Sequence, residues 1–102
     1  MALITKTAYE KDSYYVDFVS RLAAGETITL VSVTSINMAT GLDSTAEIIA
    51  SAPAPSVSGT QVIFWYQGGA AGEEHVISAR VATSNNRSLE GTVDLSVREE
   101  EQ

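Results

Sequence analysis

The sequence contains no cysteine among its 102 residues, only two prolines, one histidine and one tryptophan. Without cysteine there is no disulfide, no thiolate metal site and no thiol nucleophile, so packing alone must stabilise the fold. One imidazole is too few for an ordinary zinc site. No stretch approaches the ~20 apolar residues of a membrane-spanning helix. These absences predict a small domain that relies on its own hydrophobic core.

Basic residues are also scarce. The sequence has six Lys and Arg and thirteen Asp and Glu, which gives a net charge of −7. The basic residues are spread along the chain without a basic stripe, which argues against nucleic-acid and membrane partners. The N-terminus lacks the pattern of a signal peptide, so we expect synthesis in the cytoplasm. We expect residues 1–102 to form one domain, with residues 1–11 as an N-terminal lead-in and residues 99–102 as a frayed acidic tail.

Alternation of apolar and polar residues indicates two strands near the C-terminus. Apolar residues occupy every second position from Leu89 to Val97, and the segment from His75 to Thr83 alternates in the same way. Residues 84–87 between them are Ser-Asn-Asn-Arg, which tolerate the positive φ of a tight turn. The two segments are therefore predicted to pair as a hairpin.

Two further segments have the composition of long or central strands. Val62–Tyr66 is apolar throughout and bounded by glycines, which predicts a central strand covered on both sides, with Trp65 in the core. Glu26–Ile36 is a longer strand in which the apolar phase switches near Leu30–Val31. Such a switch predicts a β-bulge.

Shorter elements complete the predicted fold. They are strands at Tyr14–Phe18 and Thr45–Ala50, a single helical turn at Arg21–Ala24, and an edge or crossing segment at Ala52–Ser56, where prolines cannot join a central ladder. Six or seven short strands without a helical period predict an all-β fold, an immunoglobulin or fibronectin type III-like Greek-key β-sandwich. The absence of a Cys…Trp…Cys spacing favours the fibronectin-like variety.

No pattern in the sequence points to catalysis or to a bound cofactor. A Ser-His-Asp hydrolase would need His75 as its base, but the Gly-x-Ser-x-Gly nucleophile elbow is absent, and we expect His75 to fix the corner before its strand. Glu73 and Glu74 are adjacent and point apart, so they cannot flank a glycosidic bond. The loop Gly68–Gly72 lacks the Lys and Ser/Thr of a phosphate-binding loop. We therefore expect no enzyme activity, no metal and no cofactor.

Short motifs follow one another over some 80 positions of the chain. They are Tyr15–Phe18 with Arg21–Ile28, then Gly41–Leu42, then Val62–Trp65 with Gly68–Glu73, then Val81–Ser88 and Leu95–Val97. In this order they resemble a group of small immunoglobulin- or fibronectin-like proteins of tailed bacteriophages and prophages. The sequence departs from that pattern at Phe18, His75 and Asn86, where Trp, Tyr and Gly are usual. The resemblance implies a virion-associated structural module, made in the bacterial cytoplasm, without enzyme activity.

Two functions remain open at this point. The first is a structural or assembly module that docks on a capsid, neck or tail protein, with other virion proteins as partners and self-association through a sheet edge as a further alternative. The second is a carbohydrate- or surface-binding module in which exposed rings of Trp65 and the tyrosines contact polysaccharide. The candidate partner-contact residues lie in two loops: Gly68, Gly69, Gly72, Glu73, Glu74, Asn85, Asn86 and Arg87.

Overall fold

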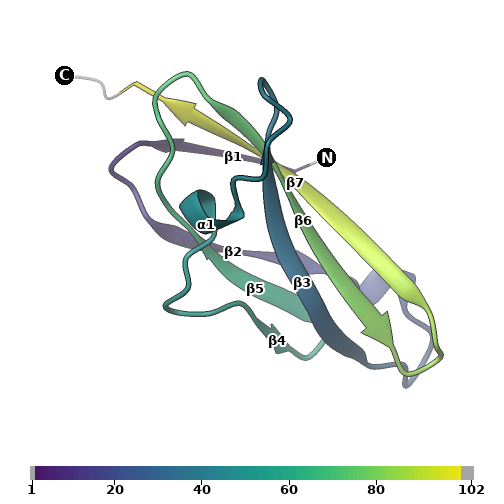
Figure 1. Cartoon of the computed structure of the whole chain (residues 1–102). Coiled ribbons are helices and arrows are strands. Elements are labelled where there is room, and N and C mark those ends of the chain that lie inside the picture. Colours follow the sequence, from purple (N-terminus) through teal and green to yellow (C-terminus); the bar gives the residue numbers. More distant parts are fainter. Residues whose placement is uncertain (1, 100–102) are drawn as a thin grey trace.

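A computed structural model describes residues 2–99, which form a sandwich of two β-sheets (Figure 1). In this part of the chain one 3-10 turn and one short helix interrupt seven strands: β1 (Ala2–Thr7), β2 (Asp12–Asp17), η1 (Val19–Arg21), β3 (Ile28–Asn37), α1 (Thr45–Ile48), β4 (Ser56–Ser58), β5 (Gln61–Tyr66), β6 (Glu74–Thr83) and β7 (Ser88–Arg98). The four-stranded sheet has the order β1-β7-β6-β3, and the three-stranded sheet has the order β2-β5-β4. The all-β prediction is confirmed.

The predicted hairpin and the predicted bulge are both present in the four-stranded sheet. Strands β6 and β7 pair antiparallel, and Asn86 in their turn has φ 62°, in the left-handed region that asparagine tolerates. Strand β3 pairs antiparallel with β6, and its register shifts between Leu30 and Ser32. Val31 lies at that shift and is exposed.

The core lies between the two sheets and is built by alternate residues of each strand. Its best buried side chains come from both sheets, from α1 and from the residue that directly follows β2: Phe18, Ile48, Val62, Phe64, Ile77 and Leu95. A Cβ built on Gly91 of β7 would lie only 2.6 Å from Val16 Cγ1. The missing side chain at Gly91 therefore lets the two sheets approach closely at this point.

Three segments differ from the sequence prediction. Residues 2–7 of the expected lead-in form β1, which pairs parallel with β7. Residues 45–48 form α1 and not a strand, because Asp43 Oδ1 accepts the Thr45 N–H (2.7 Å) and closes a turn there. The early helical turn is η1, which begins two residues before the predicted Arg21–Ala24.

Trp65 is the clearest correction. Val62, Phe64 and Tyr66 point into the core, so Trp65 lies on the opposite, outer face of β5 and is only half-buried. Phe64 fills the space between the sheets that the sequence analysis assigned to Trp65. The proline segment was predicted to be an edge or a crossing. Its prolines directly precede β4, a three-residue strand at the edge of its sheet. Of the predicted tail, only Glu99 lies within the described residues, and it is exposed.

Candidate interaction surfaces

The loop between β5 and β6, one of the two candidate contact loops, is held from inside the molecule. The buried side chain of Lys6 on β1 donates a hydrogen bond from Nζ to the carbonyl oxygen of Gly68 (2.5 Å). A Cβ at Gly68 would lie 2.6 Å from the Glu47 carbonyl oxygen, and one at Gly69 would lie 2.8 Å from a Val97 methyl. Both glycines therefore serve close packing, and the exposed part of this loop is residues 70–72.

Glu73 also bonds inward from this loop. Its Oε1 accepts the Ala70 N–H (2.9 Å) and lies 3.1 Å from His75 Nε2. The Ala70 hydrogen bond is the main reason why the pKa of Glu73 lies below its usual value, and the bond to His75 lowers it further. On the other side of the ring, His75 Nδ1 lies 2.9 Å from Ser44 Oγ, which is hydrogen-bonded to Ser35 Oγ (2.8 Å). This chain of polar groups ties the loop to the sandwich core.

Ser44, His75 and Glu73 are the residue types of a hydrolase triad, but their arrangement does not suit catalysis. In hydrolases the serine bonds to Nε2 and the carboxylate to Nδ1, whereas here the two ring nitrogens are exchanged. His75 is 0% exposed and Ser44 is buried. Neither residue lines any of four hollows on the surface of residues 2–99. The cluster acts as a structural tie, in agreement with the corner role expected for His75.

The second candidate loop, the turn between β6 and β7, is also tied down by one of its own residues. Arg87 forms a bidentate pair with Glu26, with Nη2 to Oε1 at 2.7 Å and Nε to Oε2 at 3.1 Å, and Nη2 also donates to the Arg21 carbonyl (2.6 Å). The hydrogen bond from Arg87 is the largest cause that lowers the pKa of the buried Glu26 carboxyl to about 2. Arg87 thus fastens this turn to the segment before β3, while Asn85 and Asn86 stay exposed.

The two candidate loops lie at opposite ends of the sandwich. Strand β6 joins them, and its ten residues span roughly 33 Å at the usual rise per residue (Figure 1). Such a separation means that the eight predicted contact residues do not form one surface. Arg87 is exposed but paired with Glu26, and the other exposed members, Gly72, Glu74, Asn85 and Asn86, remain candidates for contact with a partner.

An aromatic strip covers the outer face of the three-stranded sheet. Tyr15 is 52% exposed and pairs across β2 and β5 with Ile63, and Trp65 follows on the same face of β5. The Tyr14 ring lies on the other face of β2 but packs near Tyr15, with ring centroids 6.0 Å apart. The alternative in which Trp65 and the tyrosines expose their rings predicted such a surface, whereas the core placement of Trp65 did not. The period of two puts Phe64 and Trp65 on opposite faces of the strand but does not by itself decide which of them faces the core.

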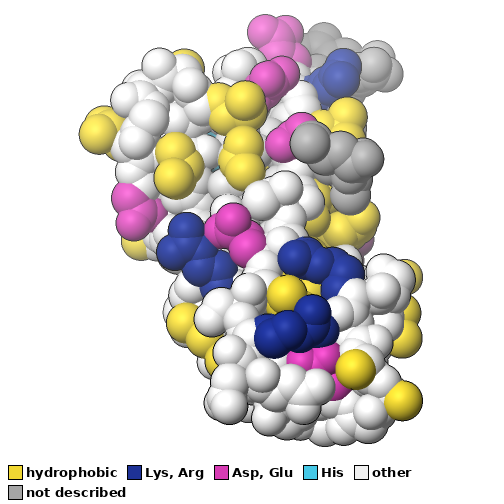
Figure 2. Space-filling view, turned by 90° about the vertical axis from the view of Figure 1, so that its right-hand side faces the viewer, with side chains coloured by type: hydrophobic (Ala, Val, Ile, Leu, Met, Phe, Trp, Pro, Cys, Tyr) yellow, Lys and Arg dark blue, Asp and Glu magenta, His cyan; other side chains and the backbone are white. Residues whose placement is uncertain are grey.

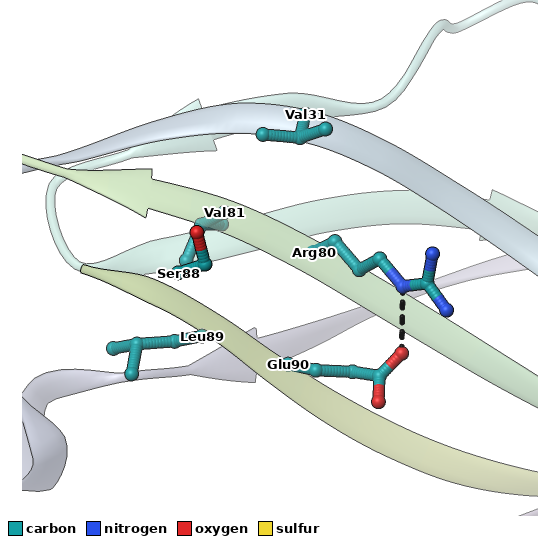
Figure 3. Close-up of a pocket in the computed structure, with 6 residues that line it drawn as sticks. All are labelled: Val31, Arg80, Val81, Ser88, Leu89 and Glu90. Atoms are coloured by element: carbon teal, nitrogen blue, oxygen red, sulfur yellow. Dashed lines mark hydrogen bonds and ion pairs between the residues drawn. The ribbon is translucent and has the colours of Figure 1, made fainter. Parts of the chain in front are cut away.

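The largest of the four hollows, about 370 Å³, lies on β3, β6 and β7 (Figure 3). Val31, Val81 and Leu89 supply its apolar lining, and Arg80 Nε donates to Glu90 Oε2 (2.8 Å) across the hairpin. Both charged groups are exposed and already paired, so the hollow lacks the converging polar groups that fix a small ligand.

Lys6 and Glu26 are buried charged residues that the sequence analysis did not single out. Each has a signal in the sequence, because Lys6 follows Ile4 and Glu26 precedes Ile28 in the apolar phase of a strand. Among residues 2–99, no three His, Asp or Glu side chains gather as a metal ion would require. In the same range, no helix has the length and apolar character needed to cross a membrane.

Comparison with protein-family models gives a match over most of the chain. The family model described as Podophage GP4 fiber-tail adaptor protein gp77 matches residues 6–96, which include the end of β1, all of β2 to β6 and most of β7. No curated protein matches the chain. The match extends over both sheets and both candidate loops. The chain therefore belongs to the podophage GP4 fiber-tail adaptor protein gp77 family and is a bacteriophage structural protein.

Proposed function

We propose that this protein joins fibre and tail in a podophage particle, by docking on proteins of both and without catalysing a reaction. The observation that carries the proposal is the family match over residues 6–96. A protein that connects two others under mechanical load must be rigid. The hydrogen bonds of Glu73, Arg87 and Lys6 hold the end loops in place and so favour a rigid sandwich.

We further propose that the sandwich is of the immunoglobulin type. In that fold, strands C, F and G form one sheet, and strands B, E and D belong to the other. If β2 to β7 are taken as strands B to G, the observed orders β7-β6-β3 and β2-β5-β4 match both sheets. The pairing of β4 with β5 favours the immunoglobulin arrangement over the fibronectin-like variety that the absence of cysteine suggested.

The absence of enzyme activity is supported by the geometry of the only histidine. His75 and Ser44 are enclosed, and their hydrogen bonds are used within the structure. Among residues 2–99, the one group with triad chemistry therefore has no route to a substrate.

The test is to delete the gene from the phage and examine purified particles by mass spectrometry and electron microscopy. In wild-type particles we expect this protein at a fixed ratio to the major tail protein. In the deletion particles we expect tails that lack fibres, with restoration by a plasmid copy of the gene. A protein that is absent from wild-type particles, or fibres that remain on the deletion particles, would refute the role.

Polysaccharide binding is a second candidate, and the exposed ring of Tyr15 beside Ile63 and Trp65 favours it. Saccharides stack on exposed aromatic rings, so a ligand on this strip should change the fluorescence of Trp65, the single tryptophan. Titration with polysaccharide from the host surface measures this directly, with Tyr15→Ala as the comparison. A fluorescence change that is equal in both proteins would argue against the strip as the binding site.

A further inference from the structure

Exposed apolar side chains gather at one end of the outer face of the four-stranded sheet. Leu3, Ile36 and Met38 are 59%, 48% and 54% exposed. They come from the two edge strands of the sheet and from the residue after β3, and the sheet places them together. Leu3 lies beside Asp94, Asp94 beside Val76, and Val76 beside Ile36, in one row across all four strands.

Glu74 belongs to the next row of the same face. The Met38 N–H donates to the Glu74 carbonyl oxygen (2.9 Å), so the two residues are neighbours. A hollow of about 220 Å³ joins the rows and is lined by Leu3, Met38, Glu74, Asp94, Leu95 and Ser96. We call Leu3, Ile36, Met38, Glu74 and Asp94 the apolar–acidic patch. In Figure 2, hydrophobic and acidic side chains lie together in the upper half, and most of the visible Lys and Arg side chains lie lower.

The carboxylates of the patch differ from the acidic group farther along the same face. Glu90 is paired with Arg80 at 2.8 Å, whereas no Lys or Arg among residues 2–99 forms an ion pair with Glu74 or Asp94. Between the patch and that ion pair, the face carries only small polar residues such as Thr92 and Ser78. The patch therefore combines exposed apolar groups with two carboxylates that form no ion pair among residues 2–99. Surfaces of this composition mark sites of protein association.

We propose that the apolar–acidic patch binds a different protein of the particle, one that presents apolar side chains flanked by Lys or Arg. This inference rests on the proposed function and names the chemistry of one partner surface. A second copy of the chain fits poorly, because a symmetric dimer would place Glu74 and Asp94 close to their own copies. The net charge of −7 adds to that repulsion. A basic partner avoids the repulsion between carboxylates and the repulsion between net charges, and its Lys or Arg side chains pair with Glu74 and Asp94.

The experiment complements the deletion phage with plasmid copies of the gene and measures the ratio of this protein to the tail protein in purified particles. One variant carries Ile36→Ser and Met38→Ser, and another carries Glu74→Gln and Asp94→Asn. Matched controls outside the patch are Val31→Ser, which removes another exposed apolar side chain, and Glu47→Gln, which removes an exposed carboxylate. Thermal unfolding of each purified variant establishes that it is folded.

We expect a fall of about tenfold in incorporation for the apolar double variant and a smaller fall for the charge variant, with both controls at the wild-type ratio. Patch variants that enter particles at the wild-type ratio would overturn the inference while leaving the adaptor role intact. If the wild-type protein itself is absent from particles, the adaptor role fails instead. Sedimentation gives an independent check, because a wild-type dimer that the patch variants convert to monomer would identify a second copy as the occupant and refute the proposal.

Discussion

Gly91 lies where the two sheets approach each other closely, and its replacement by alanine is a direct test of the packing. The new Cβ would lie 2.6 Å from Val16 Cγ1 and 3.4 Å from Phe18 Cζ, so side chains or strands must shift. Overpacking of this kind costs about 1–3 kcal/mol. Alanine also lowers the conformational entropy of the unfolded chain, which stabilises the folded state by about 0.4–1 kcal/mol. Subtracting the middle of the second range from the middle of the first gives an expected net destabilisation of about 1–2 kcal/mol.

A loss of this size is easily measured in a domain of 102 residues. It corresponds to a fall of roughly 5–15 °C in the melting temperature, which circular dichroism or calorimetry resolves. Thr92→Ala is the matched control, because Thr92 is the next residue of β7 and its side chain is exposed. We expect that variant to stay within about 0.5 kcal/mol of the wild type.

A double-mutant cycle with Val16→Ala separates a collision from a general intolerance of substitution in β7. Val16→Ala removes the methyl group that the new Cβ meets, so the double variant should be more stable than the sum of the two single effects predicts. We expect a coupling of about 0.5–3 kcal/mol, the range for residues in contact. A Gly91→Ala protein as stable as the wild type, or strictly additive effects in the cycle, would refute the close approach of the sheets.

Three other predictions concern the loops and the aromatic strip. The pKa of Glu26 is lowered from 4.5 to about 2 in the folded protein, so the pair with Arg87 stabilises the fold fully above pH 4.5 and loses its effect as the pH falls towards 2. Urea unfolding of Arg87→Met should therefore differ most from the wild type at neutral pH, and a difference that persists unchanged at pH 2 would contradict this assignment. Gly68→Ala should lower the melting temperature more than Gly72→Ala, because both positions have positive φ but only the Cβ at Gly68 meets backbone, 2.6 Å away; equal losses would show that the contact is unimportant. Acrylamide should partly quench the fluorescence of Trp65 in the folded protein, because the ring lies on the outer face of β5, and complete protection would place it in the core instead.

The parts of the fold that were predictable from sequence are those specified by neighbouring residues. The β6–β7 hairpin follows from strict alternation and from Asn85–Asn86 in the turn, and the bulge follows from a phase switch within β3. Both signals are local, so they do not depend on the partner strand.

Trp65 could not be placed because β5 is apolar on both faces. Alternation gives two possible phases for such a strand, and the sequence of the strand does not choose between them. The choice depends on two contacts between residues distant in sequence. One is the pairing of Tyr14 with Phe64, and the other is the packing of the four-stranded sheet over the face that carries Phe64. For Thr45–Ile48, the β-branched residues favoured a strand, but the hydrogen bond that the Thr45 N–H donates to the Asp43 carboxylate stabilises a helical turn instead.

The candidate loops were located correctly as turns, but their side chains could not be assigned from sequence alone. Arg87 looks like a free basic residue in an exposed turn, and only the fold brings it to Glu26, 61 residues earlier. The apolar–acidic patch was invisible for the same reason. Leu3, Ile36, Glu74 and Asp94 lie on four different strands and become neighbours only through the register of the sheet.

The fixed end loops and the free apolar–acidic patch both indicate that this sandwich binds partners through its sheet faces. In a sandwich that recognises partners through its ends, the loop side chains must be free to make contacts. Here the side chains of Glu73 and Arg87 are used in hydrogen bonds within the structure, which leaves the outer faces of the two sheets as alternative binding surfaces. The aromatic strip lies on the outer face of one sheet and the apolar–acidic patch on the outer face of the other. The proposed adaptor role requires two surfaces that do not compete for the same space, and opposite faces of a sandwich meet that requirement.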